Sequence, residues 1–101
     1  MSDRYILDGH TPVPCPDLMT WARWIESNRD AKRVASTEKN GLRVSTVFLG
    51  VDHGFVEGAA PLIFETMIFG GEHDDYQTRC STWEQAEEMH KAACEIAGIE
   101  P

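Results

Sequence analysis

Two carboxylates and two histidines lie in or just after the two most apolar stretches of the chain. Asp52 and His53 follow the first stretch, Glu65 lies inside the second, and His73 comes shortly after it. Carboxylates and imidazoles that meet in a cleft can exchange protons as general acid and base. If the two stretches pair as antiparallel strands, we expect Asp52, His53 and Glu65 to form such a cluster, with His73 nearby.

One candidate function is therefore a small metal-dependent hydrolase or ligand-binding protein that uses Asp52, His53 and Glu65. A metal site needs three or four ligands, and Asp74 or Asp75 in the following loop would complete the set. The spacing matches no established ligand motif. We expect no bound metal and no cofactor, and we favour a protein that is not an enzyme.

The alternative is that the same side chains are structural. In that case Asp52 makes a local turn hydrogen bond and His53 ends a strand. Glu65, flanked by apolar neighbours on its face of the strand, needs a cation or several donors to stay ionised. We expect an arginine such as Arg43 or Arg33 to supply that charge.

The two apolar stretches, residues 42–51 and 62–69, are rich in β-branched and aromatic residues, which predicts two central strands. Asn40 and Gly41 suit a two-residue type I′ turn, because both tolerate the positive φ that this turn requires. A strand near residues 33–39 is thus expected to pair with the first central strand.

A helix is predicted after Asp17, whose carboxylate can accept hydrogen bonds from the first-turn amides. A second helix is predicted over residues 82–98, begun by a capping box at Thr82 or at the preceding serine and ended by Gly98. Apolar residues recur at helical spacing in both and predict one buried stripe each, comprising Leu18, Trp21, Ala22 and Ile25, then Ala86, Met89, His90, Ala93, Ile96 and Ala97. His90 is expected to be a satisfied core histidine.

Residues 4–14 are predicted to form an edge ribbon, because their prolines cannot donate ladder hydrogen bonds, and residues 70–81 are predicted as a loop. The fold class is α+β over one domain, residues 1–101, with an antiparallel sheet of three to four strands and two helices packed on one face. The element order is β-α-β-β-β-α. Because both faces of the central strands carry apolar groups, a homodimer through the sheet is expected.

The net charge of −8 is unevenly placed, since residues 51–101 carry eleven acids against two bases. Such a surface repels phosphate backbones, so we expect no direct nucleic-acid binding and favour a basic protein as partner. Three cysteines without a CxxC pair predict reduced thiols. Without an apolar run long enough for a membrane span or a signal peptide, the expected location is the cytoplasm.

Four strings, LMTWARWIE, VSTVFLGVDH, FETMIFGG and STWEQAEEMH, occur in this order over about residues 4 to 91. Together they resemble a group of small uncharacterised proteins of tailed-phage and prophage genomes. The resemblance implies an accessory protein that acts inside a bacterial host cell, and it carries over no catalytic residue. We therefore expect non-enzymatic binding that inhibits or modulates a host protein, such as a defence or nucleic-acid-handling system.

Overall fold

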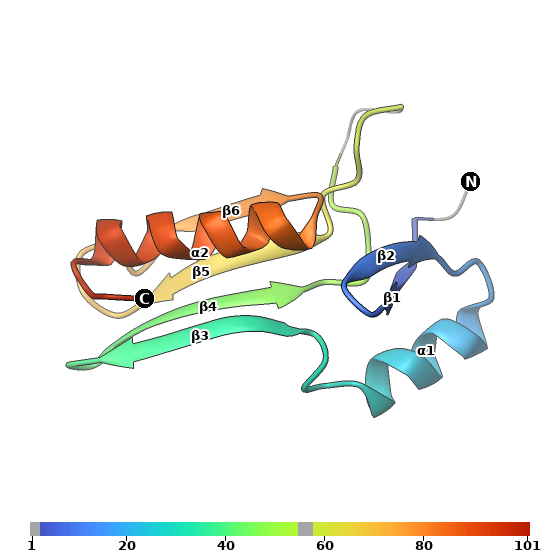
Figure 1. The fold of residues 1–101 in the computed structure, drawn as a ribbon, viewed down its shortest axis with the longest axis horizontal. Helices are drawn as coiled ribbons and strands as arrows, with labels where there is room; N and C mark the ends of the chain where they lie inside the picture. Colours follow the sequence, from blue (N-terminus) through green and yellow to red (C-terminus); the bar gives the residue numbers. More distant parts are fainter. Residues whose placement is uncertain (1–2, 55–57) are drawn as a thin grey trace.

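The computed structural model describes residues 3–54 and 58–101, and Figure 1 shows their arrangement. These residues form six strands and two helices, which confirms the α+β class. In chain order the elements are β1 (Tyr5–Asp8), β2 (Thr11–Pro14), α1 (Leu18–Ser27), β3 (Arg33–Lys39), β4 (Leu42–Phe48), β5 (Phe64–Phe69), β6 (Gln77–Cys80) and α2 (Trp83–Ala97).

Strands β3, β4, β5 and β6 form one antiparallel sheet in that order. The predicted pairing of the two central strands is confirmed, with Thr46 opposite Thr66 and Val47 opposite Glu65. The turn at Asn40 and Gly41 joins β3 to β4 with positive φ at both residues, as their types predict. The sheet is therefore a simple meander whose centre is the β4–β5 pair.

Strand β6 lies where the sequence predicts a loop. Its four residues pair with β5 and place Arg79 opposite Glu65. The segment is short and polar, so it has no apolar alternation of its own, and pairing with the free edge of β5 makes it a strand. The fourth strand of the sheet is therefore β6 and not the N-terminal ribbon that was expected at its edge.

The N-terminal ribbon is a separate two-stranded sheet of β1 and β2. It is joined to the chain after β4 by a hydrogen bond from Tyr5 N to Gly50 O of 2.8 Å. The His10 ring at its turn stacks on Trp83 at the start of α2, with ring centroids 3.7 Å apart. The ribbon is thereby held against the end of the larger sheet.

Helix α1 begins as predicted, because the Asp17 carboxylate accepts hydrogen bonds from the Thr20 amide and hydroxyl. These bonds, the hydroxyl first, lower the pKa of Asp17. The helix does not share the face of α2, however. It lies beside β1 beyond the end of the sheet, and Leu18 of its predicted buried stripe is 55% exposed (Figure 1).

Two tryptophans hold α1 in this position. Trp21 donates its indole N–H to Gly50 O at 3.0 Å, and Trp24 meets the Phe48 ring edge-on. Gly50 has φ +78°, a conformation that glycine adopts readily, and a Cβ there would also lie 2.7 Å from the end of the Ile25 side chain. Contact with the ribbon and with residue 50 therefore replaces the predicted packing on the sheet.

Helix α2 covers one face of the sheet and packs mainly on β4 and β5 (Figure 1). Its capping box at Thr82 and Gln85 and its left-handed C-cap at Gly98 are both present, as predicted. Two apolar clusters lie beneath it. One contains Leu7, Phe48, Ile63, Phe64, Trp83 and Ala86, and the other contains Val44, Ile68, Ala93, Cys94 and Ile99.

The opposite face of the sheet, which we call the open face, bears the alternate residues of the same strands. Val47 and Met67 lie half-buried at its centre, and the Arg43 guanidinium lies over the Phe69 ring, 4.6 Å from its centroid. Both helices of the described residues lie elsewhere. The expectation that both sides of the central strands carry apolar groups is thus confirmed.

Candidate functional site

Asp52 lies after β4 and bonds to the chain just before β5. Its Oδ1 atom accepts hydrogen bonds from Gly54 N at 2.7 Å and from Leu62 N at 2.9 Å. The exposed His53 beside it donates its backbone N–H to Leu62 O at 3.0 Å. These contacts match the structural alternative, in which Asp52 closes a local turn.

Glu65 lies on the open face and has two partners on β6. Its Oε2 atom accepts from Arg79 Nε at 3.0 Å and from the Gln77 side-chain amide. The predicted need for a cation is met, but by Arg79 instead of Arg43 or Arg33. The partner differs because Arg79 lies on β6, which the sequence analysis predicted as part of a loop.

His73 is separated from Asp52 and His53 by the length of β5, and Glu65 lies within that strand. Asp52 and His53 pair with Leu62, which precedes this strand, whereas His73 follows its last residue. Six residues of strand span about 20 Å. Within residues 3–54 and 58–101, no group of three or more His, Cys, Asp or Glu side chains is placed to hold a metal ion.

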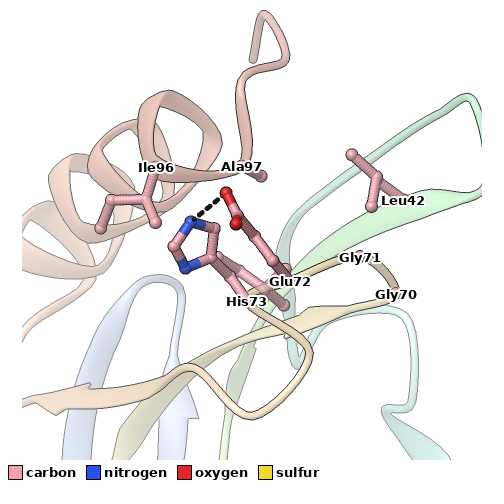
Figure 2. A pocket seen from close by; sticks show the side chains of 8 residues that line it. Leu42, Gly70, Gly71, Glu72, His73, Ile96 and Ala97 are labelled. Carbon is pink, nitrogen blue, oxygen red and sulfur yellow. Dashed lines mark ion pairs between the residues drawn. The ribbon is translucent and has the colours of Figure 1, made fainter.

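The structure places His73 at a cavity of about 220 Å³ instead, which we call the end pocket. It lies at the far end of the sheet, beside the last turn of α2 (Figure 2). Apolar side chains of β4, β5 and α2 and the loop after β5 line it, namely Leu42, Ile68, Ile96 and Ala97 with Gly70, Gly71, Glu72 and His73.

Two glycines shape the loop of the end pocket. Gly70 and Gly71 both have positive φ, and a Cβ at Gly71 would lie 2.8 Å from the Leu42 side chain. Gly70 also donates its N–H to the Asp74 carboxylate, and Tyr76 donates to the carbonyl of His73. The chain can therefore fold back tightly against the β3–β4 turn and leave a hollow under α2.

The rim of the end pocket is polar and its walls are apolar. Figure 2 shows Glu72 and His73 reaching from the loop toward the end of α2, with Leu42 across from them. Glu72 Oε1 lies 3.4 Å from His73 Nε2, and the Glu72 side chain is 87% exposed. Ile96, predicted to be buried, is 40% exposed here. A hollow of this composition suits an apolar side chain with a cation beside it.

Most of the end pocket could not be found by sequence reasoning, which singled out only His73. Leu42, Ile68 and Ala97 read as ordinary core positions, and Glu72 as part of a polar loop. The paired glycines at 70 and 71 were the only local signal, since they mark a chain that turns with positive φ.

A second polar group lies between the two apolar clusters, buried at Thr46, Thr66 and His90 and half-buried at Thr37. Thr46 Oγ1 lies 2.6 Å from Thr66 Oγ1 and 2.7 Å from His90 Nδ1, and Thr37 Oγ1 lies 2.9 Å from His90 Nε2. His90 is only 4% exposed, so the prediction of a satisfied core histidine is confirmed. Burial lowers its pKa, because desolvation disfavours the imidazolium.

This environment predicts a stability that falls in mild acid. The unfolded chain takes up a proton on His90 near pH 6.5, whereas the folded chain resists it until lower pH. Unfolding therefore binds a proton, and stability is complete above pH 6.5 and falls below it, by at most about 1.4 kcal/mol per pH unit. Urea unfolding at about pH 7.5 and 5.5 measures this. If the free energy of unfolding of a His90→Leu variant falls equally between these two pH values, His90 does not cause the loss.

Two of the three thiols, those of Cys80 and Cys94, are not activated as nucleophiles. Burial raises the pKa of Cys80 and of Cys94, which keeps both protonated at neutral pH. All three cysteines are free.

No family model, curated protein or solved structure matches the chain. Among the described residues, neither helix is both long and apolar enough to pass through a bilayer. The geometry of the end pocket is thus the basis for a functional proposal.

Proposed function

We propose that the chain is a non-enzymatic binding protein that docks a basic segment of a partner protein at the end pocket. The observation that carries this is the cavity of about 220 Å³, which has apolar side chains of Leu42, Ile68, Ile96 and Ala97 in its walls and Glu72 and His73 at its rim. Pockets for small substrates typically enclose about 300–1,000 Å³. The end pocket is smaller and fits one anchoring side chain of a protein partner.

Charge supports a basic partner. Two of the segments that line the pocket, residues 70–78 and 92–101, contain no Lys or Arg. Their acidic side chains are all exposed, namely Glu72, Asp74, Asp75, Glu95 and Glu100. The C-terminal end of the α2 dipole adds a partial negative charge at the same place. A cationic segment is therefore attracted from a distance and aligned on contact.

The accessory role inside a phage-infected bacterium belongs to the same proposal. The four strings shared with small phage proteins support it, together with the acidic surface around the end pocket. Host proteins that handle nucleic acids present basic grooves to phosphates, and an acidic protein can occupy such a groove. A defence or nucleic-acid-handling protein is thus the partner class that we favour.

Fluorescence polarisation with two labelled peptide pools tests the proposal. Both pools hold one Leu, Ile, Met or Phe per peptide, flanked by Lys and Arg in one pool and by Asp and Glu in the other. We expect the basic pool alone to bind. The double variant Glu72→Lys, Ile96→Lys is expected to weaken binding at least about tenfold, because it reverses the rim charge and removes an apolar wall.

The matched control changes a glutamate and an exposed apolar residue at the other end of the molecule. Glu26 and Met19 on α1 are exposed, so Glu26→Lys with Met19→Lys gives the same change in net charge. We expect this control to bind the basic pool within about twofold of the parent chain. Equal weakening by both double variants, or binding of the acidic pool, contradicts a specific site at the end pocket.

A further inference from the structure

Strand β3 forms one edge of the sheet and has no partner strand on its outer side within residues 3–54 and 58–101. The turn at Asn40 and Gly41 makes Lys39 and Leu42 a hydrogen-bonded pair, and such pairs alternate along the ladder. Ser36 and Glu38 therefore direct their backbone N–H and C=O groups outward. A seven-residue edge of this kind is a template for pairing with another strand.

A cleft of about 510 Å³ runs beside this edge, between β3 and α2. Val34, Ala35 and Thr37 line it from the strand, and His90 lines it from the helix. Glu87 and Lys91 lie on its α2 side, one helical turn apart. A strand added to β3 would cover this cleft with its alternate side chains.

Helix α2 runs along β3 in the same direction. Near its start, α2 contributes to the apolar cluster against which Val34 packs, and one turn later His90 bonds to Thr37. Glu87 therefore lies near the beginning of the strand's central part, and Lys91 near its end. On the open face the order of charge is opposite, with Arg33 at the start of β3 and Glu38 near its end.

This charge order is complementary to itself under a two-fold rotation through Ser36. The rotation pairs β3 antiparallel with its copy and places Glu87 opposite Lys91 of the second copy, twice over. On the open face it brings Arg33 close to Glu38 of the second copy. With strands about 4.8 Å apart and α2 above β4 and β5, the two helix axes would lie about 19 Å apart, a gap that extended Glu and Lys side chains can bridge.

We propose that two copies of this chain dimerise by pairing their β3 edges into one continuous sheet. The interface uses the β3 edge and the cleft beside it, whereas the end pocket lies at the end of the sheet and is not part of it. The dimer is thus independent of the proposed function. It also differs from a dimer through the open face, which the apolar pattern alone suggested.

Sedimentation equilibrium at about 0.15 M salt tests the dimer, where repulsion between two chains of charge −8 is screened. We expect a species of twice the 11.3 kDa chain mass. Ser36→Pro removes one outward N–H and is expected to weaken dimerisation at least about tenfold, since proline is tolerated where an edge N–H faces out. Ser36→Ala, the control, is expected to leave the dissociation constant within about twofold.

Charge exchange gives a second test that does not alter the strand. Lys91→Glu places like charges opposite each other and is expected to weaken the dimer about tenfold, whereas Glu87→Lys combined with Lys91→Glu restores the pairing. A chain that stays monomeric at every concentration overturns the proposal. The proposal is also overturned if Met67→Glu on the open face dissociates the dimer while Ser36→Pro and Lys91→Glu both leave it intact.

Discussion

Replacing His90 with Leu is expected to lower the free energy of unfolding by about 1–3 kcal/mol, although the two side chains are similar in size. The imidazole bonds to Thr37 through Nε2 and to Thr46 through Nδ1. Leucine removes both hydrogen bonds, although Thr46 keeps Thr66 as a partner and Thr37 lies at the cleft beside β3. A typical hydrogen bond contributes about 0.5–1.5 kcal/mol to stability, and here two are lost. Urea denaturation at neutral pH measures the loss.

An all-apolar version of the same layer separates lost hydrogen bonds from altered packing. Valine is close in shape to threonine, so Thr37→Val, Thr46→Val and Thr66→Val combined with His90→Leu leave no orphaned polar side chain in the layer. Replacing all partners together is close to neutral in comparable cases. We expect this fourfold variant to regain most of the stability lost in His90→Leu. If it is less stable than the single variant, the shape of the imidazole and not its hydrogen bonds accounts for the loss.

The parts of the fold that the sequence predicts are those set by neighbouring residues. Asp17 caps α1 and Thr82 with Gln85 caps α2, because each cap joins residues three positions apart. The β3–β4 turn follows from the φ preferences of Asn40 and Gly41. Alternating apolar residues likewise predict β4 and β5, since two strands that share a buried face need this pattern.

The features that escaped prediction depend on contacts between distant segments. Strand β6 exists because it pairs with β5, and Arg79 becomes the partner of Glu65 only through that pairing. Helix α1 carries an amphipathic pattern that fits a sheet face equally well. Its position beside β1 depends on the close approach of Trp21 to Gly50, and these two residues are 29 positions apart in the chain.

The candidate site follows the same division. The structural role of Asp52 was foreseeable, because an aspartate in a turn commonly bonds to the amide two residues on, here that of Gly54. The role of His73 was not, since its neighbours at the end pocket come from β4 and α2. The prediction relied on carboxylate and imidazole side chains, which suggested a cluster. The cavity is lined mostly by apolar residues and glycines, whose types alone do not indicate a binding site.

Gly70→Ala is expected to cost about 2–4 kcal/mol of folding free energy and to disturb the end pocket. Gly70 has φ +92°, a conformation that residues with a Cβ rarely adopt, and its Cβ would lie 2.7 Å from Gly41 O. That oxygen belongs to the backbone of the β3–β4 turn, so the clash cannot be relieved by a side-chain rotation. The loop would have to move away from the turn.

Gly9→Ala is the matched control, because Gly9 also has positive φ but nothing lies within 4 Å of its Cβ position. It isolates the conformational cost, about 1–2 kcal/mol. Thermal unfolding compares the two, with about 4–8 °C expected per kcal/mol in a domain of this size. We expect Gly70→Ala to melt clearly below Gly9→Ala and to bind the basic peptide pool more weakly, whereas Gly9→Ala binds it normally. If both variants melt together, contact with Gly41 does not constrain the loop, and the end pocket lacks the rigid wall that anchoring a partner side chain requires.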